Sequence, residues 1–92
     1  MNQKRDRVSI INDILLLVRS KEGEAGPTHI MYKANLSHQM LSDYMAEMLA
    51  KGFMVENVDR KKKRTYTITD KGHAFIRDYQ TIRKFFDSYG LS

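Results

Sequence analysis

Five consecutive cationic residues, 60–64, separate two segments that have the character of β-strands. Residues 65–69 are all β-branched or aromatic, which strongly favours a strand. Residues 53–59 give a weaker strand signal, because their alternation is less regular. Two strands joined by so short a segment form an antiparallel hairpin, and its tip then carries the cations.

The charge of the chain is concentrated at this tip, whose cations are Arg60, Lys61, Lys62, Lys63 and Arg64. The chain has 16 Lys+Arg against 11 Asp+Glu, a net charge of +5. Without these five residues, 11 basic residues stand against 11 acidic ones. A neutral body with one cationic projection is typical of a surface that binds a polyanion. The alternative is a solvated tip with no ligand.

Length and composition indicate one globular domain, residues 1–92, with a modest core. The longest apolar run, residues 14–18, is too short to span a membrane, and no small-residue cleavage site follows it. We therefore expect an intracellular, cytoplasmic protein. The chain has no cysteine, which excludes disulfides, thiolate catalysis and cysteine-based zinc sites.

Four segments predict helices. Residues 4–20 have apolar positions at helical spacing on more than one side, which is typical of a central core helix. After the only proline, residues 28–34 form a short helix with Thr28 as its N-cap. A tight turn leads to residues 37–51, and a last helix covers residues 70–90.

This order predicts an α+β, mainly helical fold, a winged helix-turn-helix with a C-terminal dimerisation helix. Ser37 is the expected N-cap of the third helix, and Gly52 ends it. In this fold the third helix enters the major groove of DNA, and the hairpin, or wing, lies along the backbone or in the flanking minor groove. Charge and element order agree, because the cations fall at the wing tip.

The start of the third helix supplies the candidate base contacts. The candidate DNA-binding residues outside the wing are Ser37, His38, Gln39, Ser42 and, on the preceding helix, Lys33. A helix N-terminus offers free N–H groups to a phosphate, and Gln39 suits an adenine edge. Asp43 and Glu47 oppose deep insertion, because carboxylates repel phosphates. The alternative is that these polar residues simply face solvent. The N-terminal Lys4, Arg5 and Arg7 are a candidate backbone-binding arm, and the alternative is that they are simply solvated.

An apolar seam in the last helix predicts a homodimer. Its members are Phe75, Tyr79, Ile82, Phe86 and Tyr89, spaced 4, 3, 4 and 3 residues apart over two heptads. The alternative is packing against the domain's own first helix, which we expect for the N-terminal part. So small a domain does not bury so wide an arc along its whole length.

No pattern in the chain indicates an enzyme, a cofactor or a metal. His29, His38 and His73 lack metal-ligand spacing. There is no glycine-rich phosphate loop and no nucleophile in a recognisable setting. We therefore expect a binding protein with no cofactor.

Three motifs resemble a family of small archaeal winged-helix proteins, which includes the ten-kilodalton chromatin-associated DNA-binding proteins of Sulfolobus-type archaea. The motifs are residues 30–37, 49–53 and 66–72. The resemblance covers roughly residues 8–80 and implies a dimer joined through the final helix, which binds duplex DNA with limited sequence preference. This chain departs from that family in a shorter final helix and a longer, more basic wing.

The function expected from the sequence is duplex DNA binding through recognition helix 37–51 and basic wing 60–64. The protein is then a transcriptional regulator or a chromatin-associated, nucleoid-associated protein. The alternative is a winged-helix protein–protein interaction module without nucleic-acid binding. RNA binding is a weaker option, because no aromatic stacking platform lies beside the basic residues.

Overall fold

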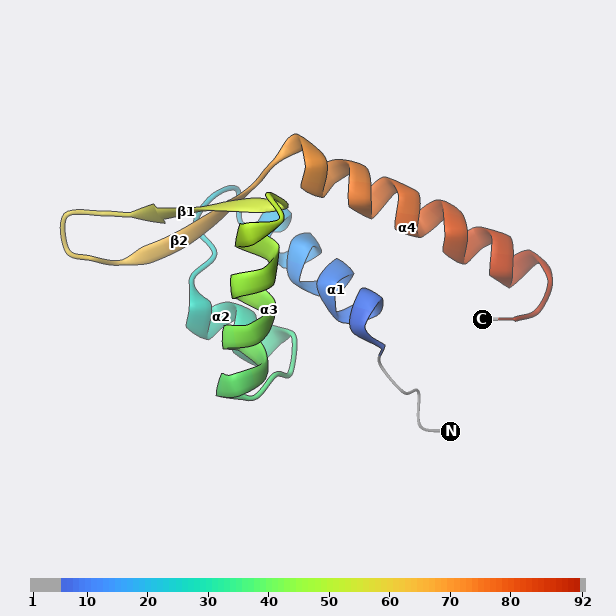
Figure 1. Ribbon diagram of the computed structural model, residues 1–92, viewed down its shortest axis with the longest axis horizontal. Coiled ribbons are helices and arrows are strands. Elements are labelled where there is room, and N and C mark those ends of the chain that lie inside the picture. The colour runs from blue at the N-terminus through green and yellow to red at the C-terminus, as the bar shows by residue number, and fades with distance from the viewer. Residues whose placement is uncertain (1–5, 92) are drawn as a thin grey trace.

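The computed structural model describes residues 6–91 and has four helices and one two-stranded sheet (Figure 1). The elements are α1 (Arg7–Ser20), α2 (Pro27–Lys33), α3 (His38–Ala50), β1 (Met54–Val58), β2 (Arg64–Ile68) and α4 (Asp70–Ser88). The predicted order of helix, short helix, turn, helix, hairpin and helix is confirmed, and with it the mainly helical winged-helix fold.

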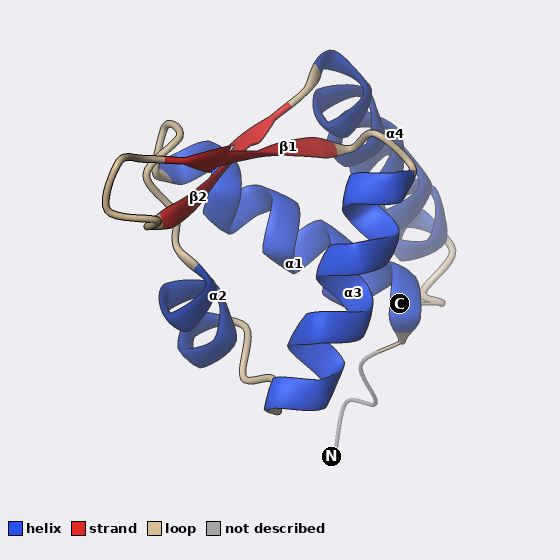
Figure 2. Ribbon diagram, turned by 60° about the vertical axis from the view of Figure 1, so that its left-hand side comes forward, coloured by secondary structure: helices blue, strands red, loops and turns tan. Residues whose placement is uncertain are grey.

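Helix α1 is the centre of the fold, as its wide apolar arc predicts. It contacts α2, β2 and α4, and Figure 2 shows the hairpin lying across it. The buried residues of α1 are Ile10, Ile11, Asn12, Ile14, Leu15 and Val18. The helix begins at Arg7, after Asp6, whose carboxylate accepts a hydrogen bond from the Ser9 N–H at 2.7 Å. Asp6 is thus the side-chain N-cap.

The hairpin pairs β1 with β2 in an antiparallel register that runs from Met54–Ile68 to Val58–Arg64. On its other side, β2 forms a bridge with Ala25, whose carbonyl oxygen accepts from the Tyr66 N–H at 3.0 Å. Within residues 6–91, no strand pairs with the outer edge of β1. Met54 and Tyr66 are buried and anchor the hairpin to the core.

Caps and residues with positive φ set the ends of the helices in the helix-turn-helix. Ser37 caps α3 as predicted, and Gly52 follows that helix with φ +76°. Asn35 adopts φ +56° in the turn, and the Leu36 N–H donates to the Met31 carbonyl at 2.9 Å, which ends α2. The predicted N-cap Thr28 is wrong. Helix α2 starts one residue earlier, with Gly26 at the N-cap position and Pro27 at the first helical position, where its fixed φ and missing N–H are tolerated.

The start of α4 closes the end of α3. Thr69 Oγ1 donates to the Gly52 carbonyl at 2.6 Å, and Lys71 Nζ donates to the Lys51 carbonyl at 2.5 Å. The Thr69 N–H donates to the Phe53 carbonyl at 3.1 Å. Gly72 permits this approach, because a Cβ there would overlap the Phe53 carbonyl oxygen. The C-terminal end of α3 and the start of α4 are therefore joined by direct hydrogen bonds.

The molecule is elongated, with principal extents of 50 × 28 × 21 Å. The tip of the hairpin and the C-terminal end of α4 lie at opposite ends of the long axis (Figure 1). Among residues 6–91, no helix is both long and apolar enough to cross a membrane.

Candidate nucleic-acid interface

The tip of the hairpin is an ordered turn built on Asp59. The Asp59 carboxylate oxygen Oδ1 accepts from the N–H groups of Lys61 and Lys63, both at 2.8 Å. The Asp59 carbonyl accepts from the Lys62 N–H at 3.0 Å, and the Asp59 N–H donates to the Lys63 carbonyl at 3.1 Å. Lys62 has φ +62°, in the left-handed region. This is the turn that closes short hairpins with one left-handed residue.

All five predicted wing cations, residues 60–64, are exposed. Within residues 6–91, no carboxylate forms an ion pair with any of them. The hairpin runs crosswise to α3 and projects beyond the helical body (Figure 1). The tip therefore presents unpaired positive charge away from the core. Asp59 was not singled out in the sequence, although Asp before a turn is a known signal for a side chain that bonds the backbone two residues on.

The predicted contact residues of α3 are exposed at its N-terminal end. The Ser37 hydroxyl already accepts from the Met40 N–H at 3.2 Å, so this side chain acts first as a cap. Gln39 Nε2 donates to Asp43 Oδ1 at 2.9 Å, one helical turn along the same face. This bond occupies an oxygen of Asp43 and fixes the orientation of Gln39. His38 and Ser42 complete the exposed polar surface.

Glu47, further along α3, is neutralised by two cations. Arg7 from the start of α1 forms an ion pair with its carboxylate, and Lys51 Nζ lies 2.6 Å from the same oxygen. Hydrogen bonds from Arg7 and Lys51 lower the pKa of Glu47 to about 2, and the carboxylate raises the pKa of Arg7. Arg7 is therefore engaged by α3. The other residues of the predicted arm, Lys4 and Arg5, lie outside the described residues.

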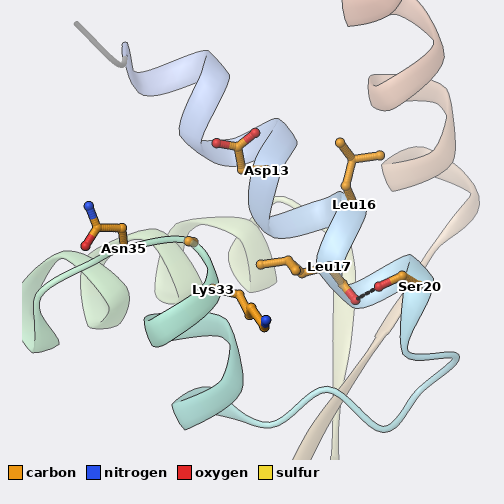
Figure 3. A pocket seen from close by; sticks show the side chains of 7 residues that line it. Asp13, Leu16, Leu17, Ser20, Lys33 and Asn35 are labelled. Carbon is orange, nitrogen blue, oxygen red and sulfur yellow. Dashed lines mark hydrogen bonds between the residues drawn. The ribbon is translucent and has the colours of Figure 1, made fainter. Parts of the chain in front are cut away.

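Lys33, the candidate contact on α2, lies beside a hollow of about 440 Å³ between α1 and the helix-turn-helix (Figure 3). The hollow is lined by Asp13, Leu16, Leu17, Ser20, Lys33, Ala34 and Asn35. The Ser20 hydroxyl donates to the Leu17 carbonyl at 2.9 Å. The Lys33 side chain is exposed at the end of α2, and its contact with a phosphate stays a prediction.

The predicted seam on α4 divides into two parts. Phe75 packs edge-on against Phe53, with ring centroids 5.3 Å apart, and Tyr79 stacks on Phe75 at 6.2 Å. These two residues belong to the domain's own packing. Beyond them the seam faces solvent, with Ile82 52%, Phe86 43% and Tyr89 68% exposed. Phe85 and Leu91, which the predicted seam left out, are also exposed and extend this apolar surface.

The histidines do not gather into a metal site. Among the described residues, no three His, Cys, Asp or Glu side chains come close enough together to hold a metal ion. The arrangement offers two surfaces instead: the polar and cationic surface of α3 and the wing, and the apolar end of α4.

The chain is similar to known proteins of one family. A family model described as winged helix-turn-helix matches residues 4–86. One uncharacterized protein of Methanocaldococcus jannaschii is 34% identical over 79 residues, which are 86% of this chain. A second from the same archaeon is 31% identical over 84 residues, 91% of this chain and 76% of that protein. The chain spans only 34% of the first relative's length.

Solved structures share the fold. Sso10a-2, a DNA-binding protein from Sulfolobus solfataricus, has a TM-score of 0.73 and 22% identity, and the match covers 94% of this chain and 90% of that one. MepR, a transcription regulator of a Staphylococcus aureus multidrug efflux pump, has a TM-score of 0.74 and 12% identity, over 89% of this chain and 62% of its own. The PcaV transcriptional regulator from Streptomyces coelicolor has a TM-score of 0.77 and 13% identity, over 90% and 62%.

Proposed function

The chain belongs to the winged helix-turn-helix family, and from that premise we propose that it binds duplex DNA as a homodimer. Helix α3 enters the major groove through the exposed residues at its N-terminal end, and the wing tip contacts the flanking phosphates or minor groove. The protein acts as a transcriptional regulator or a nucleoid-associated chromatin protein. It is a binding protein rather than an enzyme.

The observation that carries this proposal is the placement of charge. The five cations that make up the net charge of +5 lie on one exposed, ordered tip, at the end of the hairpin that follows α3 in the chain. Lys and Arg neutralise phosphates and release counterions without reading sequence. DNA-binding proteins of the same fold, such as Sso10a-2, support this use of the surface.

The exposed end of α4 supports the homodimer. Isolated soluble proteins rarely leave a contiguous set of large apolar side chains in water. A second copy packed on Ile82, Phe86 and Tyr89 covers them and relates two wings by a two-fold axis, as DNA half-sites require.

Salt-titrated binding to random-sequence duplex DNA tests the DNA interface. The variant K61Q/K62Q/K63Q removes three wing cations, and R77Q/R83Q/K84Q removes three exposed cations of α4, so both lower the net charge equally. We expect the wing variant to flatten the slope of log K against log salt by roughly 2.7 per protomer, from about 0.9 per phosphate contact. The α4 variant should change the slope much less.

Three other results would count against the proposal. Equal slopes for the two variants would mean that the wing is not the contact surface. A loss confined to one target sequence would mean that the wing reads bases. No binding of the wild type at low salt would leave the winged-helix protein-interaction module, which the exposed apolar end of α4 also suits.

A further inference from the structure

Asp59 is the one acidic residue within the cationic tip, and charge alone predicts that it weakens DNA binding. A carboxylate beside the wing cations lowers the local positive potential and repels phosphates. On that view, any substitution that removes the charge of Asp59 strengthens binding. The geometry of the tip leads to a different expectation.

Each of the four hydrogen bonds that close the tip uses Asp59. Its Oδ1 atom accepts from the N–H groups of Lys61 and Lys63 at 2.8 Å, and its own backbone pairs with Lys62 and Lys63 at 3.0 and 3.1 Å. These bonds hold Lys62 at φ +62°, a conformation that residues other than glycine seldom adopt unless their surroundings impose it.

A tip closed in this way presents its cations in fixed directions. Without the side-chain bonds, the backbone of residues 60–63 samples many conformations, and DNA binding must then order it at an entropic penalty. The carboxylate therefore has two opposed effects. Its charge lowers the affinity for DNA, whereas its hydrogen bonds raise that affinity by pre-ordering the loop.

We infer that Asp59 is a positioning residue of the wing, whose acceptor oxygen sets the affinity for duplex DNA by pre-ordering residues 60–63. This inference rests on the proposed DNA-binding function. It assigns Asp59 a role through its neighbours, since the carboxylate itself does not contact the phosphates.

Two variants with the same charge separate the two effects. Asp59→Asn removes the charge and keeps an acceptor oxygen at Oδ1, whereas Asp59→Ala removes both. Affinities for one random-sequence duplex are measured at a fixed, moderate salt concentration. We expect D59N to bind at least as tightly as the wild type and D59A to bind roughly fivefold more weakly than D59N, which is about the cost of ordering the backbone of one residue. Asp59→Ser, a shorter acceptor, should fall between them.

Hydrogen exchange of the free protein gives a second readout. The amides of Lys61 and Lys63 should exchange more slowly in the wild type and D59N than in D59A. Thermal unfolding of all variants checks that Met54 and Tyr66 still anchor the hairpin. D59S keeps the comparison usable if D59A proves unstable.

The outcomes distinguish this inference from the function on which it rests. If the wild type binds DNA and D59N and D59A bind equally well, Asp59 acts only as a charge and the inference is wrong. Unchanged exchange at Lys61 and Lys63 in D59A would also overturn it. If the wild type binds no DNA, the proposed function fails and the inference falls with it.

Discussion

Three acidic side chains of the proposed DNA-facing surface are engaged by neighbouring donors. Asp43 accepts from Gln39, Glu47 accepts from Arg7 and Lys51, and Asp59 accepts from backbone amides. From sequence alone, Asp43 and Glu47 argue against deep insertion of the helix. Arg7 and Lys51 offset the charge of Glu47, whereas Gln39 gives Asp43 a hydrogen bond without neutralising it.

Glu47 makes the stability of the fold sensitive to acid. Its pKa in the folded protein is about 2, below its ordinary value of 4.5, so the ion pair stabilises the fold fully above pH 4.5. That contribution is lost as the pH falls from 4.5 towards 2, because the unfolded chain takes up the proton first. We expect Glu47→Gln to lower the melting temperature at pH 7 and to flatten its decline between pH 4.5 and 2.

Thermal unfolding followed by circular dichroism over this pH range measures the effect. The matched variant Arg7→Gln removes the main partner and should flatten the same part of the curve. The pairing would be unimportant for stability if E47Q and the wild type lost stability in parallel over that range.

The sequence predicts some of these side-chain contacts and not others. The Ser37 cap is local and was predicted correctly, because the signal and its target lie three residues apart. The Arg7–Glu47 pair joins residues 40 positions apart. Only the tertiary fold brings them together, and no periodicity encodes it. The sequence offers Arg7 as a candidate for a DNA-binding arm, and the structure pairs its side chain with Glu47 of α3.

At the scale of elements, the junction of α3 with α4 sets the relative orientation of these two helices. Three carbonyl groups after α3 accept hydrogen bonds from Thr69 and Lys71, and the first turn of α4 lies against Phe53. Such a junction holds the two helices at a fixed relative orientation. Any movement of α4 is then passed to α3, the helix proposed to read DNA.

Gly72→Ala tests how tightly this junction is packed. In an exposed helix this change stabilises by about 1 kcal/mol. At Gly72 the new Cβ overlaps the Phe53 carbonyl oxygen and lies 2.6 Å from Ile68 Cγ1, so we expect a net loss of about 1–3 kcal/mol in the free energy of unfolding. Urea denaturation measures it.

The control is Gln80→Ala, in the exposed part of the same helix, which should change stability by about 0.5 kcal/mol or less. An alanine variant at position 72 that is as stable as the wild type, or more so, would mean that the junction opens easily.

Most element boundaries follow from the sequence, because the caps and glycines that set them are local. Ser37 and Gly52 each lie at the helix end predicted for them. The prediction of Thr28 as N-cap is wrong because Pro27 takes the first helical position, so the helix starts closer to the N-terminus than predicted. The sequence predicts that the N-terminal part of the α4 seam packs within the domain, but not at which residue the seam becomes exposed. That position depends on where Phe53 meets Phe75, which is a tertiary contact.

At the scale of the whole molecule, the two proposed surfaces are separated. The wing tip and the C-terminal end of α4 occupy opposite ends of a 50 Å axis, so a second copy bound to α4 leaves the wing free (Figure 1). In the proposed dimer, the junction between α3 and α4 fixes the separation of the two α3 helices. The spacing of the proposed DNA contacts is then set by the dimer and not by one domain alone.

Sedimentation equilibrium tests the dimer. We expect the wild type to have twice the chain mass of 10.8 kDa and Phe86→Glu to sediment as a monomer, because a carboxylate in an apolar interface loses its hydration. Gln80→Glu adds the same charge about 120° around α4 from Phe86, at 100° per residue, and should stay dimeric. A wild-type mass of 10.8 kDa at micromolar concentration would rule out this interface.

The outer edge of β1 has a further consequence for the behaviour of the protein in concentrated solution. Within the described residues this edge has no strand partner, and exposed edges of this kind are sites where copies of a protein join into larger sheets. A strand of only five residues that ends in a cluster of like charges is poorly suited to such joining, because approaching copies repel each other. The tip proposed to hold DNA therefore also protects the free protein against aggregation.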